Sequence, residues 1–71
     1  MARNEYLYEV DLGTWERGLC LKVKAIGVRE ALQKAKTEAR QRGHELLPVQ
    51  AYRIDGEKKK LAWDCWNGLI P

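Results

Sequence analysis

The sequence predicts an α+β domain of two layers, in which one helix crosses one face of a four-stranded, mostly antiparallel sheet. One segment has the three- and four-residue spacing of apolar residues that is typical of an amphipathic helix. On each side of it lie segments in which apolar and polar residues alternate, as they do in half-buried strands. The 71 residues therefore form one predicted domain, 1–71, with the order strand, strand, helix, strand, strand.

The first two predicted strands are residues 5–12, EYLYEVDL, and residues 19–26, LCLKVKAI. The short loop 13–18 between them favours a hairpin. One register brings apolar residues together on the core face and opposite charges together on the other face. Its pairs are Tyr8–Val23, Val10–Leu21, Leu12–Leu19, Leu7–Lys24 and Glu9–Lys22.

The predicted helix runs from Gly27 to Gly43, GVREALQKAKTEARQRG. Gly27 can serve as the N-cap, with Glu30 folding back on its amide, and Gly43 suits the left-handed position after a helix. The apolar stripe is rich in alanine, so we expect the helix to pack close to the sheet. Its members are Val28, Ala31, Leu32, Ala35 and Ala39.

The second pair of strands is predicted at residues 49–54, VQAYRI, and residues 60–66, KLAWDCW, with a turn at Asp55-Gly56. Pro48 at the start of the third strand favours an edge position, which gives the predicted strand order 1-2-4-3. Alternation then assigns one set of side chains to the helix side: Tyr52, Ile54, Leu61, Trp63 and Cys65. The other set lies on the opposite side: Val49, Ala51, Arg53, Ala62, Asp64 and Trp66.

A single helix leaves the other face of the sheet without cover. One interpretation is a solvated face whose cross-strand charges neutralise one another. The other is an interface with a partner protein or with a second copy of the chain, which would make a homodimer through this face. The predicted protein-binding residues combine aromatic and charged side chains: Trp15, Arg17, Lys22, Lys24, Arg53 and Trp66.

The residues offer little for catalysis. A single histidine, His44, and two cysteines, Cys20 and Cys65, show neither a nucleophile-base pattern nor the spacing of a metal site. We therefore expect no enzyme, no catalytic residues, no metal and no cofactor. Because the predicted register puts Cys20 and Cys65 on opposite faces of the sheet, we also expect two free thiols.

The charge pattern supports an alternative, nucleic-acid binding. The net charge is +3, from 13 basic and 10 acidic residues. Cations line one flank of the helix, and three lysines are predicted to form a compact patch in the second hairpin loop, where they could contact phosphate. These residues are Arg29, Lys36, Arg40, Lys58, Lys59 and Lys60. Equally, such stripes occur on ordinary solvated surfaces.

No apolar run approaches the roughly 18 residues of a membrane span, and none resembles the core of a signal peptide. We therefore expect a cytoplasmic protein without a membrane partner.

The order hairpin, helix, hairpin resembles that of small phage-encoded proteins, among them some type I-F anti-CRISPR inhibitors. The likeness is one of layout, with a helix entered by VKAIGVREALQKAK and a last strand LAWDCW that contains Trp63-Asp64-Cys65. The resemblance implies a non-enzymatic inhibitor or adaptor that binds a host protein or ribonucleoprotein complex. It assigns a role to no single residue.

Overall fold

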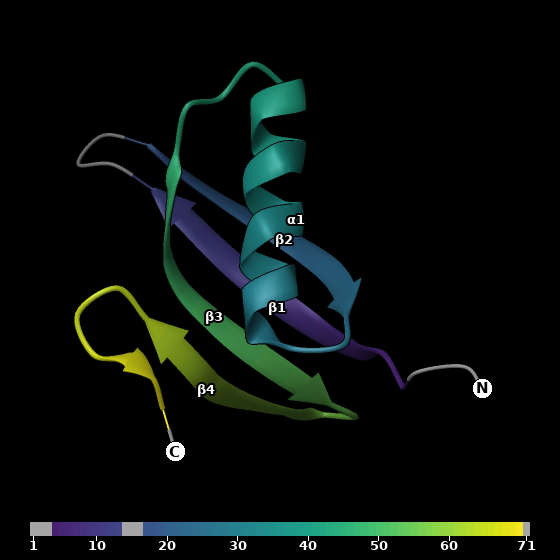
Figure 1. Ribbon diagram of the computed structural model, residues 1–71. Helices are drawn as coiled ribbons and strands as arrows, with labels where there is room; N and C mark the ends of the chain where they lie inside the picture. The colour runs from purple at the N-terminus through teal and green to yellow at the C-terminus, as the bar shows by residue number, and fades with distance from the viewer. Residues whose placement is uncertain (1–3, 14–16, 71) are drawn as a thin grey trace.

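A computed structural model describes residues 4–13 and 17–70. Within them the elements are β1 (Tyr6–Gly13), β2 (Gly18–Ala25), α1 (Val28–Gln41), β3 (Leu47–Asp55), β4 (Lys58–Asp64) and β5 (Gly68–Leu69). The strands form one antiparallel sheet of order β2-β1-β3-β4-β5, and α1 crosses one of its faces (Figure 1). The predicted α+β class is confirmed, with five strands in place of four.

The first hairpin has the predicted register. Val10 of β1 lies opposite Leu21 of β2, and Glu9 lies opposite Lys22. Alternation therefore directs Val10 and Leu21 towards α1, where both are buried. The agreement arises because both faces of this hairpin favour the same pairing, the core face through apolar contact and the other face through charge.

The predicted strand order is wrong. β3 is a central strand, paired with β1 on one side and β4 on the other. Pro48 lies opposite Leu12, next to the point where the β1–β3 register shifts between Asp11 and Leu12. A proline lacks the N–H that a regular ladder needs, and an irregularity in the ladder tolerates that lack as well as an edge does.

The faces of β3 also differ from the prediction. Ala51 pairs with Val10 and is fully buried beneath α1, so Arg53 shares the helix side and Tyr52 lies on the other face. A second register shift, between Ala51 and Tyr52, sets Ala51 opposite Trp63 and Tyr52 opposite Leu61. This shift lets Trp63 reach the core as predicted although Ala51 has replaced Tyr52 there.

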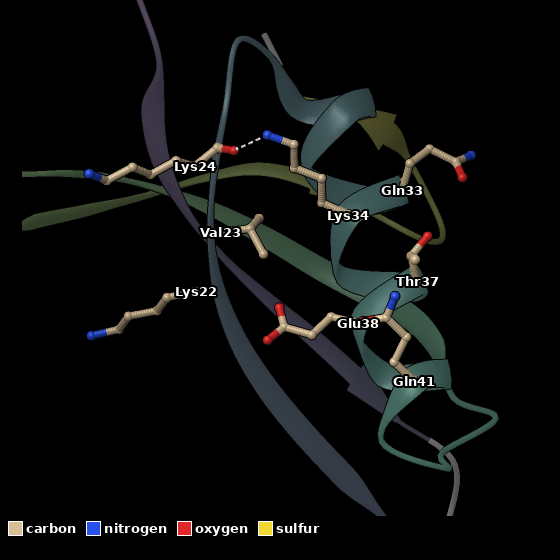
Figure 2. Close-up of a pocket in the computed structure, with 8 residues that line it drawn as sticks. All are labelled: Lys22, Val23, Lys24, Gln33, Lys34, Thr37, Glu38 and Gln41. Carbon is tan, nitrogen blue, oxygen red and sulfur yellow. Dashed lines mark hydrogen bonds between the residues drawn. The ribbon is translucent and has the colours of Figure 1, made fainter.

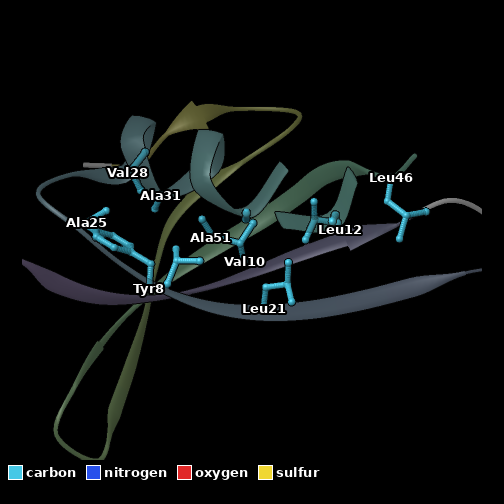
Figure 3. Close-up of a cluster of buried hydrophobic side chains, with 12 residues drawn as sticks. Tyr8, Val10, Leu12, Leu21, Ala25, Val28, Ala31, Leu46 and Ala51 are labelled. Atoms are coloured by element: carbon cyan, nitrogen blue, oxygen red, sulfur yellow. The ribbon is translucent and has the colours of Figure 1, made fainter. Parts of the chain in front are cut away.

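The core lies between α1 and the sheet (Figure 3). Three alanines of α1, Ala31, Ala35 and Ala39, are completely buried, which lets the helix pack close to the strands as predicted. The complete cluster is Tyr8, Val10, Leu12, Leu21, Val23, Ala25, Val28, Ala31, Ala35, Ala39, Leu46 and Ala51.

The ends of α1 partly follow the prediction. Gly27 is the N-cap, but no side chain donates or accepts a capping hydrogen bond there. Glu30 instead forms an ion pair with Lys34 at 3.0 Å, one helical turn further along. At the other end Gly43 has a φ of 85°, in the left-handed region that ends many helices.

Candidate functional site

The sheet face opposite α1, which we call the open face, has no helix over it in the described part of the chain (Figure 1). At its centre Glu9 of β1 forms an ion pair with Lys59 of β4, across β3. The Lys59 ammonium lies 4.5 Å from the centre of the Tyr52 ring. This hydrogen-bonded pair lowers the pKa of Glu9 and raises that of Lys59. The centre of the open face is therefore neutralised internally.

Two cations remain at the β2 side of this face. Lys22 and Lys24 are exposed, and neither forms an ion pair with another described residue. Lys22 acts on Glu9 only through its charge, which helps to lower the Glu9 pKa. The two lysines thus lie where the sequence predicted them, with their charge directed towards solvent.

Cys20 lies in the same row and is close to two carboxylates. Its sulfur and one oxygen each from Glu9 and Asp11 lie within 4.8 Å of one another, and these donor types can hold a metal ion. Desolvation, followed by a hydrogen bond to Asp11, raises the pKa of the Cys20 thiol to about 11. The thiol is therefore almost entirely in its protonated, less reactive form at neutral pH.

Both cysteines are free, as predicted, and both are exposed. The reason differs in part, because Cys65 does not lie on the helix side of a strand. It begins the turn that follows β4.

Trp66 lies in that same turn, not in a strand as predicted, and 78% of its surface is exposed. Asp64 holds the turn together. Its Oδ1 accepts hydrogen bonds from the backbone N–H groups of Trp66 at 2.9 Å and Asn67 at 2.6 Å, and its Oδ2 accepts one from the Asn67 side chain at 3.1 Å. These bonds to Asn67, and then to Trp66, lower the Asp64 pKa. The ring is thus presented to solvent by an ordered turn.

The remaining predicted protein-binding residues have different positions. Trp15 lies outside the described residues, and Arg17 is exposed immediately before β2. Arg53 was predicted on the open face but lies on the helix side, with its guanidinium carbon 3.8 Å from the centre of the Tyr6 ring. The prediction for Arg53 is wrong because the faces of β3 are reversed.

The predicted compact lysine patch is also wrong. Lys58, Lys59 and Lys60 begin β4 instead of filling a loop, so alternation separates them. Lys59 lies on the open face, whereas Lys60 lies opposite Arg53 on the helix side. On α1, Lys36 and Arg40 line a hollow beside His44, while Arg29 lies in the first turn and lines another hollow.

The structure brings together a basic cluster that the sequence analysis missed. Arg53, Lys58 and Lys60, with Asp55, line a hollow of about 310 Å³ on the β3–β4 hairpin. The same alternation would have identified this cluster if the face of β3 had been assigned correctly. One acid among three cations leaves it positive.

A larger hollow, with a volume of about 570 Å³, lies between β2 and α1 (Figure 2). We call it the β2–α1 groove. Its lining is mostly polar: Lys22, Val23, Lys24, Gln33, Lys34, Thr37, Glu38 and Gln41.

No protein-family model, curated protein or solved structure matches the chain. Among the described residues, no helix combines the length and the apolar character that crossing a membrane requires.

Proposed function

We propose that the protein is a non-catalytic protein-binding module that inhibits a larger complex or serves as its adaptor. One observation carries this proposal: the Trp66 ring stands 78% exposed on a turn that Asp64 holds in place. Tryptophan is the residue type most enriched among the side chains that dominate binding energy, and an ordered exposed ring loses little conformational freedom when a partner covers it.

The open face supports the same function. Glu9 and Lys59 at its centre are already paired, so a partner that covers these two side chains has no isolated charge to compensate there. Lys22 and Lys24 leave a positive rim, which favours a partner surface with acidic groups. The strand-strand-helix-strand-strand layout, shared with small phage-encoded inhibitors, supports a host protein or ribonucleoprotein complex in the cytoplasm as that partner.

The test is affinity capture with the wild-type protein, with Trp66→Ala, and with Trp15→Ala combined with Trp66→Ala. Truncating a true anchor costs about 2 kcal/mol or more, so these variants should lose the wild-type partner. Leu47→Ala is the matched control, because Leu47 is also an exposed apolar residue, at 64%, but lies at the start of β3. Circular dichroism should be unchanged in all variants. Equal recovery of the same partners by every variant would refute the proposal.

A second candidate function is nucleic-acid binding, and the hollow lined by Arg53, Lys58 and Lys60 favours it. Three cations around one concave site suit a phosphate group. Gel shifts with duplex DNA and RNA at increasing salt test this function. Arg53→Gln combined with Lys60→Gln should abolish a shift that falls steeply with salt, whereas Arg29→Gln, Lys36→Gln and Arg40→Gln test the flank of α1. No shift at low salt leaves the protein-binding proposal alone.

A further inference from the structure

β2 is an edge strand, and no described residue pairs with its outer side from Gly18 to Ala25. The Lys24 carbonyl accepts a hydrogen bond from Lys34 Nζ at 2.7 Å, so this carbonyl points away from β1 and towards α1 (Figure 2). In an antiparallel pair, the N–H and C=O groups of every second residue point to the same side. The backbone groups of Cys20 and Lys22 therefore point outwards with those of Lys24, and they form a ladder that no neighbouring strand of the described chain uses.

The β2–α1 groove lies beside this ladder. A strand added to a sheet lies about 4.8 Å from its neighbour, which would place an added strand in this groove. The opposite wall belongs to α1, from which Lys34 and Glu38 project towards β2 (Figure 2). The neutral side chains of Gln33, Thr37 and Gln41 complete the lining further round the helix. At one end of the groove the exposed Lys34 ammonium donates a hydrogen bond to the Lys24 carbonyl. A backbone N–H of the added strand can replace Lys34 as the donor to this carbonyl.

We propose that the β2–α1 groove binds an extended, acidic segment of a partner protein as an additional strand on β2. The segment carries an acidic residue at every second position, on the side of Lys22 and Lys24, and neutral polar residues between them. This inference rests on the proposed protein-binding function and names the kind of segment that is bound.

Charge determines the preferred side chains on both faces of the added strand. On its inner side β2 already pairs with a strand that sets an acidic residue against a lysine, because Glu9 of β1 lies opposite Lys22. The outer side presents the same lysines without a carboxylate partner among the described residues. On the helix side, Lys34 and Glu38 project from α1 towards β2 (Figure 2). Both are already paired on the helix, Lys34 with Glu30 and Glu38 with Arg42, so this wall favours neutral polar residues on that face.

A second copy of the chain is a poorer occupant of this edge. In a two-fold antiparallel pair of β2 strands, the outward-facing residues Cys20, Lys22 and Lys24 of one copy would lie beside the same residues of the other. The lysines of one β2 strand would repel the lysines that lie next to them on the β2 strand of the other copy. Lysines on edge strands commonly prevent such self-pairing. The charges that oppose a homodimer at this edge are those that favour an acidic segment.

The experiment is an NMR titration of the full chain with an eight-residue capped peptide of alternating glutamate and threonine. We expect shift changes along β2 and slower amide exchange at Cys20, Lys22 and Lys24. Leu21 and Val23, whose amides point towards β1, should change little. Lys22→Glu combined with Lys24→Glu should weaken peptide binding roughly tenfold or more, because the peptide glutamates would then lie opposite glutamates at positions 22 and 24 and be repelled by them. The same double variant should prefer a peptide of alternating lysine and threonine.

Two controls separate strand addition from general charge attraction. Arg29→Glu combined with Arg40→Glu also reverses two exposed cations, so its net charge equals that of the first variant, but it lies outside the groove and should leave peptide affinity unchanged. Methylating the peptide amides that face β2 should abolish binding, because it removes the donors of the ladder.

The proposal is overturned if the methylated peptide binds as well as the unmethylated one, or if the Lys22 and Lys24 reversal has no effect. Absence of binding at millimolar peptide, or dimerisation of the chain through β2, overturns it as well. If Trp66-dependent capture of a partner persists in those cases, the proposed function stands and only the strand-addition mode fails. If Trp66 proves irrelevant while the peptide binds as described, strand addition stands and the role of the Trp66 turn fails.

Discussion

Glu9 and Lys59 form an ion pair between β1 and β4, two strands that are not neighbours in the sheet. The Lys59 side chain reaches across β3 and covers the Tyr52 ring, whose centre is 4.5 Å from Nζ. One lysine thus links three strands and removes the charge from the centre of the open face. Among the described residues, the cations of that face without an ion pair, Lys22 and Lys24, consequently lie at its β2 rim.

The ion pair predicts an acid-dependent stability. The Glu9 pKa is lowered in the folded protein from its ordinary value of 4.5, so the contribution of Glu9 is complete above that value and is lost as pH falls through the folded pKa. Lys59→Met should therefore lower the urea midpoint at neutral pH and shrink the midpoint difference between about pH 7 and pH 3. Lys58→Met is the control. An equal pH dependence in both variants would contradict the assignment.

The two thiols should differ in reactivity. With a pKa of about 11, Cys20 is only about one part in a thousand thiolate at pH 8, and the thiolate is the form that alkylates. Cys65 is exposed in a turn, so iodoacetamide should modify Cys65 first. Asp11→Asn should speed the reaction of Cys20 by removing a negative charge and a hydrogen-bond acceptor. Peptide mapping by mass spectrometry measures both rates, and faster modification of Cys20 in the wild type would refute the prediction.

The first hairpin was predictable because its two faces impose the same register. The pairs Val10–Leu21 and Glu9–Lys22 satisfy burial and charge together, and a shift by one residue breaks both. For the same reason the sequence located Lys22 and Lys24 correctly. The apolar stripe of α1 was predictable because the helical spacing of its apolar residues can be recognised within one segment, without knowing which strands it packs against.

The second hairpin was not predictable in the same way. Tyr52 has a larger apolar surface than Ala51, which favours its burial. Ala51 is buried instead because a small side chain fits where the alanine-rich stripe of α1 approaches β3. Two register shifts then alter the faces locally, and alternation cannot reveal where they occur. This is why Arg53 was placed on the wrong face. The two-residue β5 was missed because so short a strand has no period.

The core prediction concerns Leu12, which is 1% exposed and is one of the two largest fully buried side chains. Leu12→Ala should cost about 2–5 kcal/mol of unfolding free energy, through lost burial and the cavity left behind. In a domain of this size that can exceed the stability available, so Leu12→Val tests the same site more gently. Leu47→Ala, at an exposed position, should be nearly neutral in urea denaturation. Equal effects of the substitutions at Leu12 and Leu47 would contradict the packing.

The turn between β3 and β4 depends on Gly56, which has a φ of 62°. A Cβ there meets no atom within 4 Å, so Gly56→Ala costs only the backbone penalty, about 1–2 kcal/mol. Gly18→Ala is the matched control, because its backbone is not left-handed and its added Cβ makes only an ordinary contact at 4.0 Å. Thermal unfolding should show a lower midpoint for Gly56→Ala alone. Equal midpoints in the two variants would mean that Gly56 does not adopt this conformation.

Asp64 links the end of β4 to the turn that carries Trp66. Its substitution should loosen this turn while leaving the sheet folded. Asp64→Ala removes the acceptor that holds the Trp66 and Asn67 amides, while the β1–β2 and β1–β3 ladders keep all their pairs. We therefore expect Asp64→Ala to weaken partner capture nearly as much as Trp66→Ala does. The fluorescence anisotropy of the tryptophans should fall, because the loosened turn lets the Trp66 ring reorient.

The pH dependence gives an independent check on the same turn. Because the Asp64 pKa is lowered by the amide hydrogen bonds, the turn is stabilised above the ordinary value of 3.8 and loosens as pH falls through the folded pKa. Wild type at low pH should thus approach the anisotropy of Asp64→Ala, and the variant itself should change little with pH. Asp55→Ala, which alters an exposed carboxylate at the end of β3, is the control. If Asp64→Ala binds the partner as tightly as wild type while Trp66→Ala does not, the ring acts without the ordered turn, and pre-organisation is not the source of its binding energy.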